Sequence, residues 1–260
     1  MFADESLALR ILNSNAHIAR SVAEACASLG LPGPLILETD NAVGVFAGDS
    51  SPITQVNGVK PGADLRPFLE FYAGRTKRWE VSITPFSGIE AVQQLIEMGL
   101  KPFQFENTVY RPLRNAIPDD DKGFDIRPVE SEADCAAWSR ILNRGFHGDH
   151  VDETMEFLGK VSAAMKSVRR YLAYVDGQPV SAAGLFEMGD LVALGGAATL
   201  PEFRGRGIHS ALISHRLRAA SQKHDLAIMG ASPGSSSQRN TERFGFRLAY
   251  TQICFEYQSA

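Results

Sequence analysis

The chain has 260 residues, of which 44% are hydrophobic and 22% charged, a length that suits two domains of ordinary size. Its formal net charge of -4 argues against a nucleic-acid surface, which needs clustered excess Lys and Arg. No apolar run is long enough to cross a membrane and no targeting peptide is visible. The three cysteines are widely spaced, so they predict neither disulfides nor a metal site and favour a cytoplasmic location.

The chain opens with apolar residues spaced as on an amphipathic helix. A linker is then predicted near residues 114–124, where prolines, a glycine and three consecutive aspartates occur. It divides the chain into domains at 1–120 and 121–260. Residues 1–121 contain ten basic and fifteen acidic side chains and the remainder sixteen and fifteen. The second half is therefore the better place for an anion.

The two halves end alike. LIEMGLKPFQFENTVYRPL closes the first and TERFGFRLAYTQICFEYQS the second, which aligns Gly99 with Gly245 and Val109 with Phe255. Each segment is typical of a helix, a glycine turn and a strand. The similarity predicts an internal duplication.

The second half should begin with two helices. Helical spacing covers residues 132–146 and 151–168, with Ser131 and Asp152 as N-cap candidates. Three strands follow within residues 169–200. Asp176-Gly177 and Gly189-Asp190 are predicted to join them as hairpins.

Alternating elements complete the predicted order. A helix should extend to about His224, followed by a strand over residues 225–231. Ser235 and Gln238 form a plausible capping box for a short helix. A last strand is expected after Gly245.

The segment PEFRGRGIHSALI, residues 201–213, lies between a predicted strand and a predicted helix. Backbone N–H groups at a helix start converge on an anion, and Gly205 and Gly207 would let a pyrophosphate approach closely. Arg204 and Arg206 can add positive charge at the rim. The glycine spacing fits neither a P-loop nor a dinucleotide fingerprint. The alternative is a glycine-rich turn with solvated arginines.

In combination with the surrounding elements, this loop resembles the acetyl-CoA loop of the GNAT acetyltransferase superfamily. The pattern reads Arg204-Gly205-Arg206-Gly207-Ile208-His209, and the resemblance covers residues 125–260. It implies an α/β (α+β) fold of two GNAT-like domains, each a mixed, mostly antiparallel sheet flanked by helices. The first domain would be a degenerate copy.

The resemblance also implies acetyl-CoA as cosubstrate and assigns its contacts. The strand before the loop would bond the pantetheine arm, the loop amides would bind the pyrophosphate, and a helix asparagine would lie near the pantetheine. These contacts fall on Ala197, Ala198, Thr199, Arg204, Gly205, Arg206, Gly207, Ile208, His209, Ser210 and Asn240. Asn240 could instead be an ordinary polar helix position.

Two positions depart from the family pattern. His209 stands where Gly or Ala is usual, and its ring predicts a gain in CoA affinity below about pH 6.5, as expected when an anion favours protonated imidazole. Thr241 stands where the family often has a tyrosine that protonates the thiolate. Tyr250 is a substitute candidate, although a packed strand tyrosine is the simpler interpretation.

A general base is not obvious. Glu187 is the carboxylate nearest to the predicted meander strands. The segment FHGDHVDE contributes His147, Asp149, His150 and Glu153, which form either an acceptor-recognition loop or a solvated one. Two histidines three residues apart in a loop do not by themselves predict a metal site.

The first half lacks the cofactor loop. The matching segment reads GVKPGADLRPF, residues 58–68, in which Pro61 has no amide donor. It is therefore not expected to bind CoA. This half would wall the acceptor cleft or be purely structural.

The sequence thus predicts an acetyl-CoA-dependent N-acetyltransferase that acts on a small-molecule or peptide amine. The alternative from another class is a CoA-binding sensor without turnover, suggested by the missing tyrosine and strand carboxylate. A third alternative is aminoacyl transfer from tRNA, which the near-neutral second half disfavours. The acceptor and the oligomeric state stay open.

Overall fold

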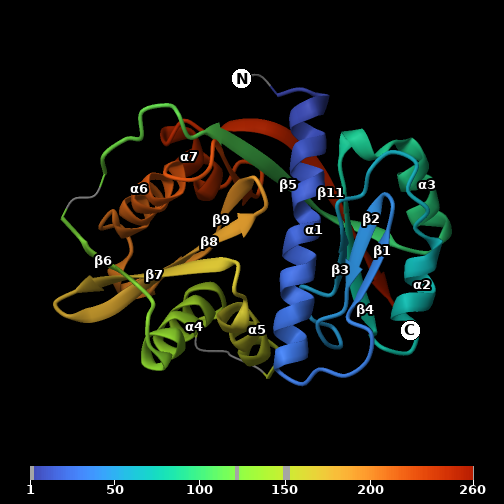
Figure 1. Ribbon diagram of the computed structural model, residues 1–260, viewed down its shortest axis with the longest axis horizontal. Helices are drawn as coiled ribbons and strands as arrows, with labels where there is room; N and C mark the ends of the chain where they lie inside the picture. The colour runs from blue at the N-terminus through green and yellow to red at the C-terminus, as the bar shows by residue number, and fades with distance from the viewer. Residues whose placement is uncertain (1–2, 121–122, 149–152, 260) are drawn as a thin grey trace. The chain divides into compact units, whose positions relative to one another are not determined.

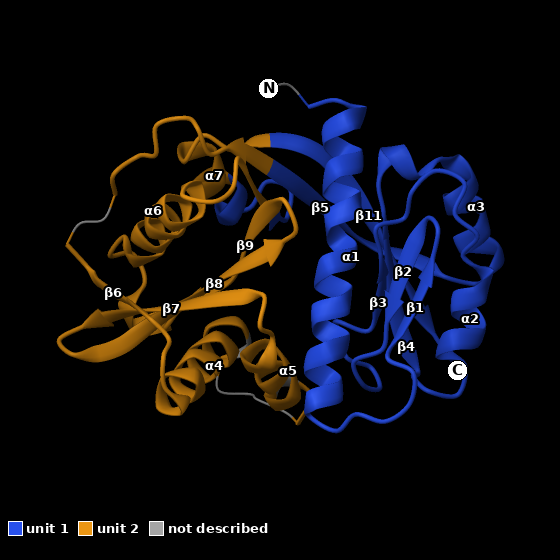
Figure 2. Ribbon diagram, in the orientation of Figure 1, with its two compact units in different colours: residues 1–109, 230–238, 248–260 blue, residues 110–229, 239–247 orange. Residues whose placement is uncertain are grey.

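The computed structural model describes residues 3–120, 123–148 and 153–259 (Figure 1). The chain forms two compact units (Figure 2). Unit 1 comprises residues 1–109, 230–238 and 248–260, and unit 2 comprises residues 110–229 and 239–247. The predicted division at residues 120 and 121 stays a prediction about domains. The compact units differ from it because two segments of the second half complete unit 1.

Unit 1 is a sheet with helices. Its elements in chain order are α1 Glu5–Ser28, β1 Ile36–Thr39, β2 Ala42–Val45, β3 Gln55–Asn57, α2 Arg66–Tyr72, β4 Arg78–Ile83, a 3-10 turn η1 Pro85–Ser87, α3 Ile89–Glu97, β5 Lys101–Pro112 and, from the end of the chain, β11 Arg247–Gln258. The strand order is β1-β2-β3-β4-β11-β5. Strands β3 and β4 are parallel, whereas β11 pairs antiparallel with β4 from Ile253–Ile83 to Gln258–Arg78.

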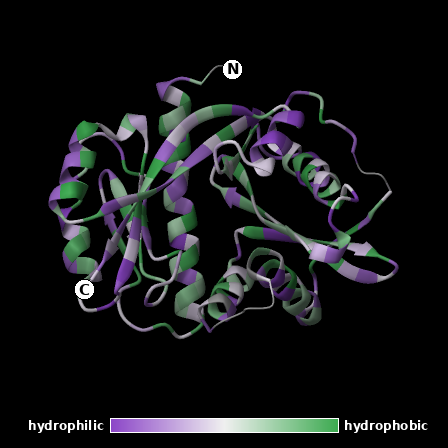
Figure 3. Ribbon diagram, turned by 180° about the vertical axis from the view of Figure 1, so that it is seen from behind, coloured by the Kyte–Doolittle hydropathy of each residue, from purple (hydrophilic) through white to green (hydrophobic). Residues whose placement is uncertain are grey.

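The first helix forms as its sequence predicts. Asp4 caps it, because its carboxylate accepts a hydrogen bond of 2.8 Å from the amide of Leu7. Leu7, Ile11 and Val22 are buried on one side, and α1 packs on β1, β2 and β3. In Figure 3, hydrophobic and hydrophilic residues both appear along this helix. Burial of its apolar side holds α1 on the sheet.

Unit 2 contains strands β6 to β10 and the helices that flank them. Its elements are β6 Asp125–Pro128, α4 Glu132–His147, α5 Glu153–Ala164, β7 Val168–Val175, β8 Gln178–Met188, β9 Leu191–Thr199, a 3-10 turn η2 Pro201–Phe203, α6 Ile208–Ser221, β10 Leu226–Ala231, which ends in unit 1, and α7 Ser236–Arg243, which begins there. The strand order is β10-β9-β8-β7-β6. Among these strand pairs, only β9–β10 is parallel. Helices α4 and α6 lie on opposite sides of β7 and β8 (Figure 1).

Most predicted elements of the second half are confirmed. Ser131 and Asp134 form a capping box at α4, and Asp176 and Gly177 both have positive φ in the turn between β7 and β8. The predicted extension of the second helix to residue 168 is wrong. Helix α5 ends at Ala164, because Val168 already pairs with β8. Asp152 lies outside the described residues, and β6 was not anticipated.

The two similar segments fold alike. In the first, α3 is followed by Gly99 with φ 83° and by β5, and in the second, α7 is followed by Gly245 with φ 76° and by β11. Both helices end in the same way. The amide of Leu100 donates to the carbonyl of Leu95, and the amide of Phe246 donates to that of Thr241, which is the Schellman pattern that a left-handed glycine permits. The predicted order of helix, glycine turn and strand is confirmed in each half.

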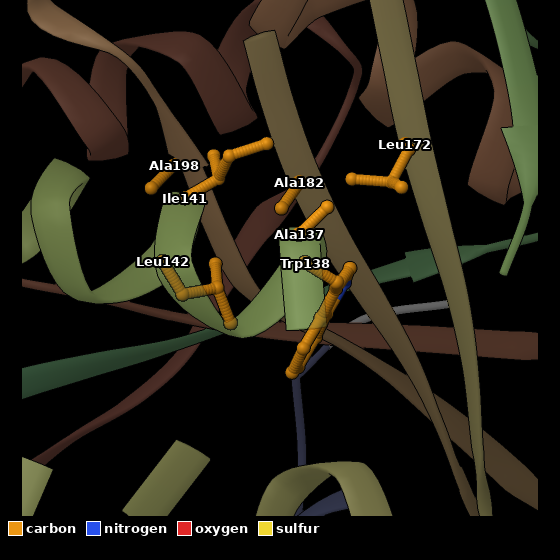
Figure 4. Close-up of a cluster of buried hydrophobic side chains, with 7 residues drawn as sticks. All are labelled: Ala137, Trp138, Ile141, Leu142, Leu172, Ala182 and Ala198. Carbon is orange, nitrogen blue, oxygen red and sulfur yellow. The ribbon is translucent and has the colours of Figure 1, made fainter. Parts of the chain in front are cut away.

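A hydrophobic cluster joins α4 to the sheet of unit 2 (Figure 4). It consists of Ala137, Trp138, Ile141, Leu142, Leu172, Ala182 and Ala198. The Trp138 side chain is 0% exposed, and its indole nitrogen donates to the carbonyl of Ala183 over 3.1 Å. A Cβ on Gly145 would lie 2.5 Å from that of Ala198. Glycine at this position therefore allows α4 to approach β9 closely.

Unit 1 contains a partly buried carboxylate. Glu106 on β5 accepts a hydrogen bond of 2.7 Å from the side-chain amide of Gln252 on β11. A Cβ on Gly230 would lie 2.6 Å from a carboxylate oxygen of Glu106. Desolvation raises the pKa of Glu106 above its usual range. The folded protein therefore binds a proton at Glu106 more readily than an exposed glutamate would.

We expect Glu106→Gln to raise the melting temperature at pH 7.5 and not at pH 4. A raised pKa means that the folded state binds the proton more tightly than the unfolded state, so stability falls as pH rises above the unfolded pKa. Glutamine keeps an acceptor for Gln252 and removes the buried charge. Thermal denaturation at both pH values tests this, with the exposed Glu24→Gln as control. A lower melting temperature of Glu106→Gln than of the wild type at pH 7.5 would contradict this expectation.

Candidate cofactor site

The loop before α6 presents free backbone donors. Gly205 has φ 77°, and Gly207 is the N-cap of α6 with φ 90° and ψ 2°. No side chain caps this helix and no acidic residue lies in its first turn. The amides of Ile208, His209 and Ser210 therefore have no acceptor within the helix. Together with the helix dipole they form a site for an anion.

Arg204 braces the loop. Its Nε donates to the carbonyl of Thr199 over 3.1 Å, and its Nη2 donates to that of Gly145 over 2.8 Å. This side chain links the end of β9 to α4, and its contribution of positive charge at the rim of the loop stays a prediction. Arg206 is exposed, and its guanidinium carbon lies 5.0 Å from the centre of the Phe203 ring.

The end of β9 separates from β10. The two parallel strands pair at Val192–Ala227 and Ala193–Ile228, and within the described residues the pairing does not extend to Ala197–Thr199. On its other side, β9 remains paired with β8 to its end, because Thr199 pairs with Ser181. A strand edge of this kind leaves backbone groups available to a ligand. The binding of a pantetheine arm along this edge stays a prediction.

A β-bulge lies immediately before this edge. Gly184 pairs with Gly195, but Ala182 pairs with Ala198, so one residue of β8 faces two residues of β9. Gly196 has φ 48°, as expected for a bulge built on a left-handed glycine. The adjacent glycines at 195 and 196 were the signal for this bulge in the sequence.

His209 lies in the first turn of α6 with a partly buried side chain. Burial, and secondarily the positive charge of Arg216, lower the pKa of the His209 imidazole to about 4. The ring is therefore neutral at physiological pH in the free protein. The expected gain in CoA affinity below pH 6.5 is revised accordingly, while a contact through the His209 amide stays a prediction.

We expect the ratio of CoA affinities of the wild-type protein and His209→Ala to stay constant from pH 5.5 to pH 8. The depressed pKa has a separate effect on stability. Because the unfolded imidazole protonates near pH 6.5, folding stability is lost as pH falls from there towards 4. His209→Ala should therefore melt at a higher temperature relative to wild type at pH 4.5 than at pH 7.5. Affinity that rises in acid for the wild type alone would instead place the ring against phosphate.

Helix α7 contains two positions that the family resemblance singled out, Asn240 and Thr241. Asn240 is partly buried, and its side-chain oxygen accepts a long hydrogen bond of 3.4 Å from Arg243. Its role near a pantetheine stays a prediction. Thr241 is 0% exposed, and its carbonyl caps the helix end. A buried threonine with a hydroxyl of high pKa is not suited to replace the family tyrosine as an acid.

The two candidate catalytic side chains, those of Glu187 and Tyr250, both contact other residues. Glu187 on β8 lies opposite Val192 and 3.3 Å from the guanidinium of Arg169. Tyr250 belongs to unit 1, is 5% exposed, and packs edge-on against Phe86. Burial raises the pKa of the Tyr250 phenol to about 12. Their catalytic roles stay predictions, and the packed environment of Tyr250 agrees with the simpler interpretation.

The predicted acceptor loop falls largely outside the described residues, including Asp149, His150 and the side chain of His147. Glu153 begins α5 and is exposed. Among the described residues there is no group of His, Cys, Asp and Glu that could hold a metal ion. Likewise, none of the helices in the described ranges is both long and apolar enough to span a membrane.

The matching loop of the first half has its amides occupied. The amide of Lys60 donates to the carbonyl of Asn41, and that of Leu65 donates to the side chain of Gln94. The carbonyl of Val59 accepts a hydrogen bond of 2.7 Å from Ser87 in η1. Pro61 has no amide proton. The amides of Lys60 and Leu65 thus already donate to groups within unit 1.

Comparison with known proteins identifies the second half. The model of the acetyltransferase (GNAT) family matches residues 135–246, which include the bulged strand, the loop and α6. The similarity to this family is thus confined to residues 135–246. The loop at residues 204–210 lies within the matched segment. The left-handed glycines, the uncapped start of α6 and the separated edge of β9 occur together there.

Solved structures extend the similarity to the whole chain. A GCN5-related N-acetyltransferase from Kribbella flavida is 15% identical with a TM-score of 0.65, covering 94% of this chain and 96% of that one. A tandem GNAT protein from the clavulanic acid biosynthesis pathway is 11% identical with a TM-score of 0.60, covering 100% and 97%. A functionally unknown conserved protein from Staphylococcus epidermidis ATCC 12228 is 14% identical with a TM-score of 0.62, covering 90% and 97%. No curated protein matches the chain. The chain has a tandem GNAT fold.

Proposed function

We propose that this protein transfers an acetyl group from acetyl-CoA to an amine, with the cofactor held by the GNAT domain. The uncapped start of α6 carries this proposal, because three free amides follow two left-handed glycines there. The pyrophosphate would accept from these amides. The pantetheine would lie along the free edge of Ala197–Thr199 and bring the thioester towards β10.

The chemistry needs a neutral amine beside the thioester. The amine nitrogen attacks the thioester carbonyl, the C–S bond breaks, and the thiolate takes up the proton that the amine loses. Holding the two reactants together supplies a large share of such a rate enhancement. The engaged states of Glu187 and Tyr250 are compatible with a mechanism in which positioning contributes most.

Thiol release from acetyl-CoA with a panel of small amines and peptide N-termini tests the proposal, with mass spectrometry to detect the acetylated product. Calorimetry should give one CoA site per chain, because the corresponding first-half amides are occupied. Two equivalent sites would contradict the single-site assignment. Absence of CoA binding would refute the proposal as a whole.

The second candidate function is a CoA sensor without turnover. It is favoured by the buried Thr241 in place of the family tyrosine and by the Glu187–Arg169 ion pair. Tight CoA binding without thiol release across the amine panel would support the sensor. Product formation above the uncatalysed rate would exclude it.

A further inference from the structure

Arg216 on α6 is buried without a carboxylate partner. Its side chain is 0% exposed, and no ion pair involves it among the described residues. Its Nε donates to the carbonyl of Leu212 over 3.0 Å, while Nη2 is buried and has no hydrogen-bond partner in the described structure. Burying an unpaired cation is costly. Arginine is therefore a costly residue at a position whose only role is to fill the core.

The remaining donor of Arg216 reaches the bulge of β9. Nη1 donates to the carbonyl of Gly184 over 2.8 Å and to that of Gly195 over 3.3 Å. These two glycines are the last cross-strand pair before the register shift. A bulge disrupts the ladder of strand hydrogen bonds locally, and the guanidinium supplies donors to carbonyls at that point.

The bulge is also fixed by packing around the same glycines. A Cβ on Gly184 would lie 2.9 Å from the Phe186 ring, and a Cβ on Gly195 would lie 3.1 Å from it. The aromatic ring thus lies over the glycine pair. Arg216 holds their carbonyls from α6, so both the side chains and the backbone of the bulge have defined contacts.

Helix α6 therefore carries two features of one site. Its first turn presents the amides for the pyrophosphate, and Arg216 lies eight residues after Ile208, about 12 Å along the axis at 1.5 Å per residue. Of the two carbonyls that it holds, that of Gly195 lies on β9 just before Ala197–Thr199, the proposed pantetheine edge, and that of Gly184 lies on the paired strand β8. A rigid helix with contacts at both places fixes the distance between them.

We propose that Arg216 is a positioning residue that locks the β9 bulge to α6 and so sets the pantetheine edge relative to the pyrophosphate amides. This inference rests on the proposed function, since it concerns the same cofactor. Arg216 itself touches neither the cofactor nor the reacting atoms. It acts through the backbone of Gly184 and Gly195.

The test compares CoA with 3′-phosphoadenosine 5′-diphosphate, which has the phosphates and no pantetheine. In Arg216→Met, calorimetry should show affinity for the diphosphate within about twofold of wild type and affinity for CoA lower by tenfold or more. Arg216→Lys keeps a cation with a donor that can reach one carbonyl, so its CoA affinity should be intermediate. Arg218→Met removes an exposed cation from the same helix and should leave both affinities unchanged.

Hydrogen exchange supplies a readout that does not depend on ligand. The amides of residues 196–199 should exchange faster in Arg216→Met, while those of the α6 core at residues 211–217 should not. Unchanged CoA affinity with unchanged exchange would overturn the inference, as would equal losses for CoA and the diphosphate. If Arg216→Met does not fold, Arg216→Lys decides between these outcomes. Failure of the wild type to bind CoA would instead refute the proposed function, and the inference with it.

Discussion

Replacing Gly207 by valine is expected to lower CoA affinity roughly 10- to 100-fold. At φ 90° and ψ 2° a β-branched residue is strained by about 1–3 kcal/mol, and each 1.4 kcal/mol corresponds to a factor of ten. The loop would relieve this strain by turning the residue to negative φ. That rotation moves the amides of Ile208, His209 and Ser210 away from a common point, so all pyrophosphate contacts weaken together.

The Gly207 effect is measured by calorimetric titration with CoA and needs a control for backbone strain. Gly177 has φ 76° in the hairpin between β7 and β8, and an added Cβ there meets nothing within 4 Å. Gly177→Val should lower thermal stability and leave CoA affinity unchanged. Arg204→Ala removes the hydrogen bonds to the carbonyls of Thr199 and Gly145. It should lower CoA affinity only a few-fold. An equal loss from Arg204→Ala and Gly207→Val would mean that side-chain charge is the main contact.

Trp138→Ala is expected to destabilise unit 2 by about 3–5 kcal/mol, the usual range for removing a fully buried tryptophan from a core. The cavity would open beside Ala182 and Ala198. The carbonyl of Ala183 would also lose its indole donor. Because Ala198 belongs to the proposed pantetheine edge, CoA binding should weaken along with the core.

Urea denaturation followed by far-UV circular dichroism measures this loss. If the units unfold in separate transitions, that of unit 2 is the one that moves to higher urea when CoA is added, because a ligand stabilises the unit that binds it. Trp79 of unit 1 is also buried, at 2% exposure, and Trp79→Ala is the matched control that should shift the other transition. Trp138→Phe should retain most of the stability. A CoA-linked transition unchanged by Trp138→Ala would show that α4 does not support the cofactor strand.

Local features of the second half followed from the sequence because they depend on few neighbouring residues. Ser131 caps α4 through Asp134, three residues away, and Asp176-Gly177 forms its turn because adjacent residues adopt positive φ. Gly205 and Gly207 likewise marked the loop, since left-handed backbone is easiest for glycine. The end of α5 was misplaced because Val168 continues a helical pattern, while strand pairing with Phe186 determines its state.

Only the tertiary structure shows which residues distant in sequence contact the side chains of these elements. The sequence marks Arg204 and Arg206 as equivalent, yet Arg204 reaches Gly145, 59 residues away, while Arg206 lies over a neighbouring ring. Arg216 is a charged residue among the apolar positions of its helix, and only the packing of α6 on β8 and β9 places it against two carbonyls. Burial, and secondarily the charge of Arg216, lowers the pKa of His209 and keeps its ring neutral. The sequence determined the cofactor loop, because a left-handed turn and a helix start are local, whereas burial and long-range hydrogen bonds determined the pKa values and the support of the site.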